Sequence, residues 1–193
     1  MKASKSMCIY AFDSLRKEID SSFKQDPREP TEIPTSLESP LFVTWKKRDH
    51  GSEYDLRGCI GNLSGLPLRA GIGEYAVIAG TRDHRFMPIS ASELKQLRVT
   101  VSVLIDYEDG KDCYDWTVGT HGIIIKLING QSAVFLPEVA SEQGWDKETT
   151  LKHLIRKAGY HRSYVDCQSV IKSLTRYKSS KMSMTYEEYS KIE

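Results

Sequence analysis

The chain has 193 residues and a nearly balanced charge, with 27 Lys and Arg against 26 Asp and Glu and a net charge of +1. A chain of this length can bury roughly 70% of its unfolded surface, so it can build a core without disulfides or metals. The near-zero net charge excludes strongly basic nucleic-acid-binding and membrane-surface proteins. Any contact with a polyanion must therefore depend on a local cluster of cations.

The four cysteines are far apart and form no CxxC pair: Cys8, Cys59, Cys113 and Cys167. Their spacing matches neither a zinc site nor a dithiol redox motif, so we expect free thiols, no metal and no cofactor. No apolar run approaches the ~18 residues of a membrane-spanning helix, and the first residues lack the apolar core of a signal peptide. We therefore expect a soluble protein of the cytoplasm, the nucleus or both, without membrane contact.

The chain begins with helical periodicity and continues into a predicted hairpin. Apolar residues recur at helical spacing over 4–23, and four prolines within 24–40 indicate an extended segment that follows the surface. Residues 41–47 are β-branched and aromatic, and the turn residues 49–52 would join them to a second strand that contains Cys59. The sequence thus predicts an antiparallel pair of strands here.

The middle of the chain alternates helix, loop and strand. Residues 64–67 are predicted to start a helix of about three to four turns, and the charged segment 81–88 is predicted to be irregular. Ser90 and Glu93 match a capping box that opens a short helix, and a strand is predicted at 99–105. Two predicted helices therefore separate the strand that contains Cys59 from the strand at 99–105.

The C-terminal half contains the strongest hairpin signal of the chain. Asn129-Gly130 joins the apolar strand 123–128 to the strand that follows it. Two helices come next, the second at 147–157, and the tail over 173–185 alternates like at least one strand. Together these elements predict an α+β fold, an antiparallel sheet flanked by helices, in a single domain over residues 1–193 that could divide into two lobes.

The stretch from Asp55 to Leu63 carries the most unusual residue choices. Cys59 lies between Gly58 and Gly61, and glycine inside a strand indicates a bulge or a close approach of the backbone to another group, which could be a ligand. Arg57 is two positions from Cys59, so strand alternation would place its charge on the same face and make the thiol a better nucleophile. The alternative is a buried structural cysteine between glycines that permit tight packing.

Three further residues are candidates for the same site. His121, between Gly119 and Gly122, could accept the proton of the thiol, because histidine titrates near neutral pH; the alternative is a turn histidine bonded to the backbone. Asp83 and Arg85 could orient the histidine and bind an anionic group, since a guanidinium binds carboxylate or phosphate through two parallel hydrogen bonds. The alternative for this pair is an ion pair that locks its loop.

Four motifs occur in a fixed order along the chain: Leu56-Arg57-Gly58-Cys59-Ile60-Gly61, Asp83 with Arg85, Phe86 and Pro88, Gly119 with His121 and Gly122, and Leu136-Pro137-Glu138-Val139-Ala140 with Gln143-Gly144-Trp145-Asp146. Together they resemble the AMMECR domain family, and the resemblance extends from Met7 to Tyr189. It implies a larger antiparallel-sheet lobe and a smaller lobe that meet at a groove, among folds that bind nucleotides and nucleic acids.

Two functional hypotheses follow. The first is an enzyme in which a cysteine in the groove attacks an anionic small molecule or nucleotide-like substrate. Its catalytic residues would be Cys59, His121 and Asp83, and its substrate-binding residues would be Arg57, Gly58, Gly61 and Arg85. The second is a non-catalytic module that uses the same groove to bind a nucleotide, nucleic acid or a protein partner.

Overall fold

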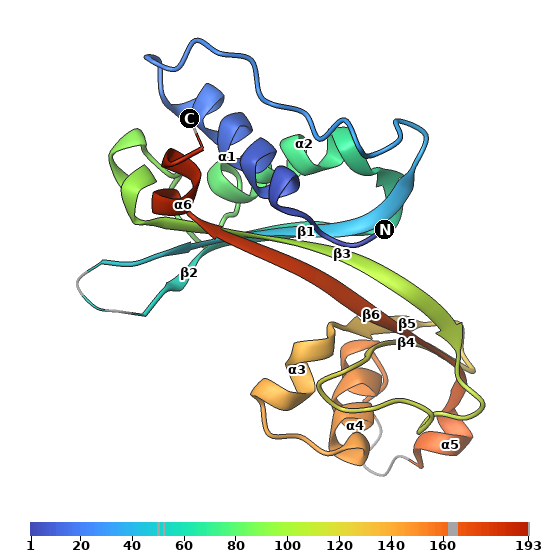
Figure 1. Cartoon of the computed structure of the whole chain (residues 1–193). Helices are drawn as coiled ribbons and strands as arrows, with labels where there is room; N and C mark the ends of the chain where they lie inside the picture. Colours follow the sequence, from blue (N-terminus) through green and yellow to red (C-terminus); the bar gives the residue numbers. More distant parts are fainter. Residues whose placement is uncertain (50, 52, 162–165, 193) are drawn as a thin grey trace. The chain divides into compact units, whose positions relative to one another are not determined.

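Six strands form one antiparallel sheet in the order β2-β1-β3-β6-β4-β5, with helices packed against it, which confirms the predicted α+β class (Figure 1). The computed structural model describes residues 1–49, 51, 53–161 and 166–192. By its internal contacts the chain divides into two compact units, one formed by Met1–Val103 with Ser180–Glu193 and the other by Leu104–Ser179. Strands β3 and β6 contribute residues to both units.

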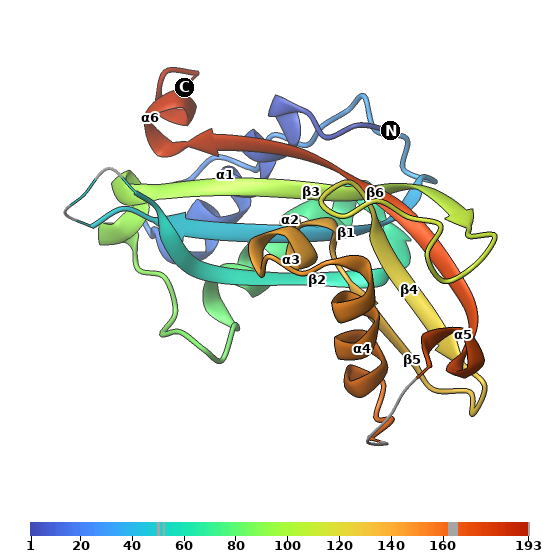
Figure 2. The same ribbon diagram turned by 90° about the horizontal axis from the view of Figure 1, so that it is seen from below.

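The first unit packs two helices on one face of its strands. Its elements are α1 (Lys5–Ile19), β1 (Glu38–Lys47), β2 (Asp55–Pro67), α2 (Leu68–Thr81), the 3-10 helix η1 (Ala91–Gln96), the start of β3 (Leu97–Asp109), the end of β6 (Ile171–Thr185) and α6 (Tyr186–Ser190). Seen from below, α1 and α2 lie behind β1, β2 and β3 (Figure 2). The indole N–H of Trp45 donates to the Ala76 carbonyl at 2.8 Å, and the Phe12 ring meets the indole edge-on at 5.1 Å. Trp45 thus anchors both helices to β1.

Strand β1 separates a buried face from a more open one. Leu41, Val43 and Trp45 are fully buried, whereas the alternating residues between them are half-buried. β1 pairs antiparallel with β2, as predicted, with Trp45 opposite Gly58 and Thr44 opposite Cys59. The predicted turn at 49–52 falls partly on residues 50 and 52, which lie outside the described part of the chain.

A buried carboxylate ties three segments of the first unit together. Asp13 on α1 accepts hydrogen bonds from Arg28 at 2.7 and 2.8 Å and from the Tyr189 hydroxyl at 2.6 Å. Burial raises the pKa of Asp13, but the hydrogen bonds from Arg28 and Tyr189 outweigh it and leave this pKa below its usual value. The extended segment after α1 and the C-terminal helix α6 are therefore both fastened to α1.

The second unit contains the predicted C-terminal hairpin. Its remaining elements are β4 (Gly122–Leu127), β5 (Ser132–Phe135), α3 (Pro137–Glu142), α4 (Lys147–Lys157) and α5 (Cys167–Val170). β4 and β5 pair antiparallel through a turn in which Gly130 has a φ of +86°, a conformation that favours glycine. The Asp146 side chain caps α4 by accepting the Thr149 N–H at 2.7 Å.

Several elements are longer than the sequence predicts. β2 continues through residues 64–67, where a helix start was expected, because Ser39 and Glu38 pair with Leu66 and Pro67. β6 is one uninterrupted strand of 15 residues, and α6 follows it without having been predicted. Strand pairing with a distant segment overrides the weak local preferences of polar residues.

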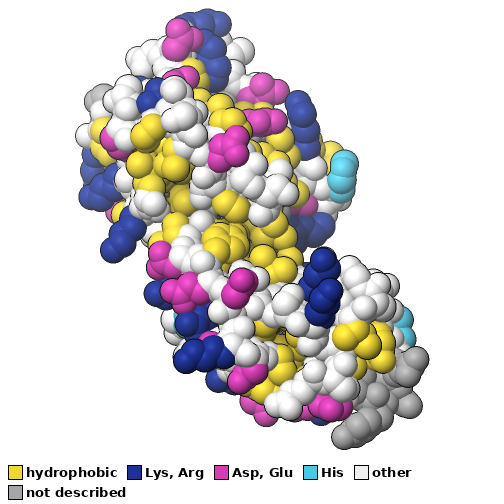
Figure 3. All heavy atoms as spheres, turned by 90° about the vertical axis from the view of Figure 1, so that its right-hand side faces the viewer, with side chains coloured by type: hydrophobic (Ala, Val, Ile, Leu, Met, Phe, Trp, Pro, Cys, Tyr) yellow, Lys and Arg dark blue, Asp and Glu magenta, His cyan; other side chains and the backbone are white. Residues whose placement is uncertain are grey.

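Charged side chains are mixed on the face drawn in Figure 3, where Lys and Arg alternate with Asp and Glu around patches of hydrophobic atoms. This distribution agrees with the net charge of +1 and offers no broad basic track on that face. Within the described part of the chain, no helix is both long and apolar enough to cross a bilayer.

Candidate functional site

The Cys59 thiol lies on the face of the sheet that turns away from α2. The neighbouring pair, Trp45 and Gly58, faces the helices: a Cβ on Gly58 would lie 2.0 Å from the Ala79 carbonyl oxygen of α2. Cys59 and Thr44 form the next pair and therefore point to the opposite face. Here Cys59 is half-buried, and the Thr44 hydroxyl donates a hydrogen bond to its sulfur at 3.2 Å.

The backbone of Cys59 is held from outside the sheet by two side chains. β2 is the edge strand, so the N–H and C=O of Cys59 that point away from β1 have no strand partner. Asp83 Oδ2 accepts the Cys59 N–H at 2.9 Å, and Arg85 Nη2 donates to the Cys59 carbonyl at 3.3 Å. The two side chains also bind each other through Arg85 Nε at 3.0 Å and Nη2 at 2.7 Å. Together they hold the peptide groups of Cys59 in one geometry.

The electrostatics of this pair favour a positioning role for Asp83. Hydrogen bonds from Arg85 and from the Cys59 N–H hold the pKa of the Asp83 carboxyl far below its usual value, and Asp83 in turn raises the pKa of Arg85. A carboxylate with so low a pKa stays charged near neutral pH and is a poor proton acceptor. The structure therefore brings Asp83 and Arg85 to Cys59 as an ion pair that binds its backbone.

Arg57 has a partner of its own. Its guanidinium donates to Glu93 through Nε at 3.0 Å and through Nη2 at 3.1 Å. A register shift between Trp45 and Lys46 leaves Arg57 without an opposite residue on β1, so simple alternation does not place it beside Cys59. Burial raises the pKa of Glu93, but hydrogen bonds from Arg57 and the Ser90 N–H outweigh it and lower that pKa to about 2. Of Arg57 and Arg85, it is Arg85 that is hydrogen-bonded to Cys59.

The two glycines of the motif are explained by close packing. Gly58 permits the approach of α2 described above, and a Cβ on Gly61 would lie 2.3 Å from both the Leu41 carbonyl oxygen and the Phe42 ring. The predicted close approach therefore occurs at both glycines: α2 approaches Gly58, and β1 approaches Gly61. Each glycine has a packing role in addition to any contact with a substrate.

His121 belongs to the second unit, whereas the cluster around Cys59 belongs to the first. Its Nδ1 accepts the Thr117 N–H at 3.0 Å, so the proton of the neutral ring is on Nε2. Burial lowers the pKa of His121, and the charges of Arg176 and Lys178 lower it further. In this geometry the ring is a hydrogen-bond donor at Nε2, and it could accept a proton only after losing its bond to Thr117.

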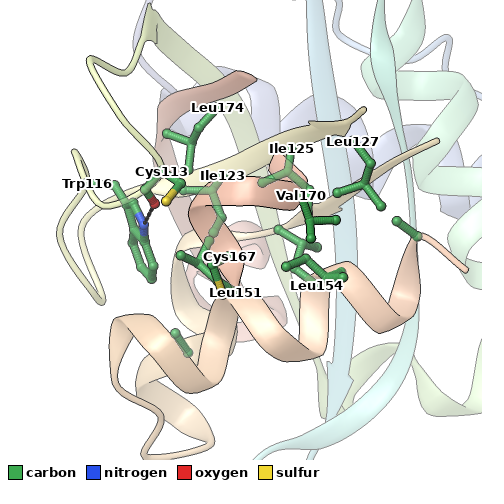
Figure 4. Packing of buried hydrophobic residues seen from close by; sticks show 13 residues of the cluster. Cys113, Trp116, Ile123, Ile125, Leu127, Leu151, Leu154, Cys167, Val170 and Leu174 are labelled. Carbon is green, nitrogen blue, oxygen red and sulfur yellow. Dashed lines mark hydrogen bonds between the residues drawn. The ribbon is translucent and has the colours of Figure 1, made fainter. Parts of the chain in front are cut away.

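The other three cysteines are buried. Burial raises the pKa of Cys8 to about 12 and of Cys167 to about 11, and it also raises the pKa of Cys113. Figure 4 shows Cys113 and Cys167 among the apolar side chains of the second unit. Cys59 is thus the one cysteine with a partly accessible thiol. Within the described residues, no group of three His, Cys, Asp or Glu side chains is arranged to hold a metal.

Comparison with known proteins gives the family. A family model described as AMMECR1 matches residues 8–182, a range that contains all four motifs of the sequence analysis. The chain belongs to the AMMECR1 family. It is 43% identical to an uncharacterised protein of Arabidopsis thaliana over 98% of this chain and 88% of that protein, and 39% identical to one of Schizosaccharomyces pombe over 96% and 94%. It is also similar to the crystal structure of the uncharacterised protein PH0010 of Pyrococcus horikoshii, with a TM-score of 0.68, 27% identity, and 92% and 88% of the two chains covered.

Sequence reasoning missed three residues that share the face of Cys59 in this AMMECR1-family chain. They are Thr44, Lys46 and Arg98, and each is placed on the face of Cys59 by strand pairing. The sequence could have placed Thr44 and Lys46 on one face of the strand 41–47, because both alternate with the buried Trp45. The sequence does not say which strand lies opposite, so it gives no reason to join them to Cys59 or to Arg98.

Proposed function

We propose that this AMMECR1-family protein is an enzyme that uses Cys59 as a nucleophile toward a small, anionic electrophile. One observation carries the proposal: the backbone of Cys59 is held at both its N–H and its C=O by the Asp83–Arg85 pair, while the half-buried thiol is directed away from the helices. A reactive group that is fixed in place before the substrate arrives loses little entropy on reaction.

Two neighbours of the Cys59 thiol support attack on an anionic substrate. The Thr44 hydroxyl donates to the sulfur, which holds the thiol in one orientation. The Arg85 side chain is 57% exposed, so its guanidinium adds positive charge beside Cys59 and faces an approaching anion. In this proposal Asp83 and Arg85 are positioning residues, and the thiol proton passes to solvent.

The test is alkylation of the folded protein at neutral pH, followed by mass spectrometry of its peptides. With iodoacetate, the Cys59 sulfur forms a bond to carbon, iodide leaves and the thiol proton passes to the buffer. We expect Cys59 to be labelled well before the buried Cys8, Cys113 and Cys167. Equal rates at all four cysteines would contradict the proposal.

Two variants sharpen this test. Thr44→Val should slow labelling of Cys59 several-fold, whereas Thr100→Val should leave the rate unchanged, because the Thr100 hydroxyl pairs with Ser183 at 2.8 Å instead of the sulfur. Arg85→Gln should reduce labelling by anionic iodoacetate more than labelling by neutral iodoacetamide. The proposal fails if Thr44→Val and Thr100→Val behave alike.

The alternative is a binding module that uses the same face without chemistry, for a nucleotide, nucleic acid or a protein partner. The hydroxyls of Thr44, Thr100 and Ser183 support this alternative, because they offer hydrogen bonds across neighbouring strands. The net charge of +1 favours a local site over a long nucleic-acid track. A Cys59→Ser variant that retained full function would favour the module, whereas complete loss with an intact fold would favour the enzyme.

A further inference from the structure

Two cations lie directly opposite each other on the face that carries Cys59. Lys46 on β1 pairs with Arg98 on β3, in the same register that places Thr44 opposite Thr100. The alternate pair, Trp45 and Val99, is fully buried on the helix side. Lys46 and Arg98 therefore point to the side of Thr44, whose hydroxyl binds the Cys59 sulfur.

These two cations lack the acidic partner that three arginines of the first unit have. Arg28 binds Asp13, Arg57 binds Glu93 and Arg85 binds Asp83. Among the residues that the structure describes, no ion pair or side-chain hydrogen bond joins Lys46 or Arg98 to an acceptor. Like charges directly opposite each other in a sheet are destabilising. An anion bound between Lys46 and Arg98 would therefore relieve their repulsion and stabilise the protein.

Arg98 is held in place by an aromatic ring. Its guanidinium carbon lies 4.4 Å from the centre of the Tyr54 ring, and its Nε is buried without a hydrogen-bond partner. Stacking fixes the plane of a guanidinium without occupying its outer N–H groups. A fixed, unpaired guanidinium is suited to bind an oxyanion through two parallel hydrogen bonds.

We propose that Lys46 and Arg98 form a subsite for the phosphate group of a small substrate. This subsite rests on the proposed function, because it belongs to the same site as the Cys59 nucleophile. The substrate class that it indicates is a phosphate ester with an electrophilic atom that reaches Cys59. Cys59 is opposite Thr44, and Lys46 is two residues further along β1, so the sulfur and this cation occupy diagonal positions, roughly 7 Å apart at their Cβ atoms. A small molecule spans that separation.

The test is a titration with inorganic phosphate, followed by two-dimensional NMR of the backbone and side-chain amides. We expect saturable shifts centred on Lys46 and Arg98. The Lys46→Gln/Arg98→Gln variant should bind phosphate at least about 10-fold more weakly, because charge-assisted hydrogen bonds are lost. The matched control is Lys24→Gln/Lys95→Gln, which removes the same charge from two exposed positions outside this face and should bind like the wild type.

Further arms keep the outcomes separate. Lys46→Gln alone should also weaken phosphate binding. This single variant retains the contact between Arg98 and Tyr54, so it tests the subsite even if the double variant disturbs the fold. Acetate should bind more weakly than phosphate; equal binding would overturn the phosphate assignment, as would shifts that persist in Lys46→Gln/Arg98→Gln. A Cys59→Ser variant should still bind phosphate. If phosphate binds but Cys59 is unreactive, only the nucleophilic role of Cys59 is contradicted. If Cys59 is reactive but phosphate does not bind, only the phosphate subsite is contradicted.

Discussion

Asp83 holds Cys59 by its backbone, because Oδ2 accepts the Cys59 N–H at 2.9 Å on the outer side of the edge strand β2. An edge strand leaves such groups unpaired unless a side chain or another strand covers them. The loop after α2 therefore fixes the geometry of the motif cysteine and also closes part of the exposed edge of the sheet.

Asp83→Asn should destabilise the protein. The variant removes the charge that pairs with Arg85 and weakens the acceptor of the Cys59 N–H, and the Asp83 side chain is only 4% exposed. We expect the free energy of unfolding in urea to fall by about 1–3 kcal/mol. The control is Asp26→Asn, since Asp26 pairs with Lys17 at a side chain that is 97% exposed and should contribute little. Equal effects of the two variants would contradict the role given to Asp83.

Gly58→Ala should be strongly destabilising. Its Cβ would lie 2.0 Å from the Ala79 carbonyl oxygen, so helix α2 would have to move away from β2. We expect a loss of about 2 kcal/mol or more in the free energy of unfolding. Gly65→Ala on the same strand is the matched control, because its Cβ would meet Glu38 only at 3.6 Å, which is ordinary contact. A Gly58→Ala variant as stable as Gly65→Ala would show that α2 does not pack on β2 at this point.

Asp13 should make stability depend on pH. Its folded pKa lies below the ordinary value of 3.8, so its contribution is complete above that value and is lost as pH falls through the lower, folded pKa. In Asp13→Asn the free energy of unfolding should fall by about 2 kcal/mol or more near neutral pH. It should also change less between about pH 6 and pH 3 than in the wild type. Parallel pH curves for the two proteins would contradict this prediction.

His121 should be neutral at pH 7 with its proton on Nε2. The Thr117 N–H occupies Nδ1, and burial together with Arg176 and Lys178 lowers the pKa of the ring. Nitrogen-15 NMR of the imidazole should therefore show the Nε2–H tautomer and a titration below the ordinary value of 6.5. A proton on Nδ1 would instead leave Nε2 free to act as a base.

The sequence by itself determined the elements whose signals are local. The capping box of Ser90 and Glu93, the Asn129-Gly130 hairpin and the helix α4 at Lys147–Lys157 occur as predicted. Each of these elements is specified by residues that are close together in the sequence, so a short segment is enough to predict it. The family also followed from motifs that can be recognised one at a time.

Only the tertiary structure decided what the functional side chains touch. Whether Arg57 meets Cys59 or Glu93 depends on a register shift in β2, and the meeting of Lys46 with Arg98 depends on β3 pairing with β1. Likewise, Asp83 reaches Cys59 because a loop 24 positions along the chain folds over the edge of the sheet. Such contacts arise from the pairing and packing of distant segments, because a strand's own residues set its two faces but not the neighbour that each face meets.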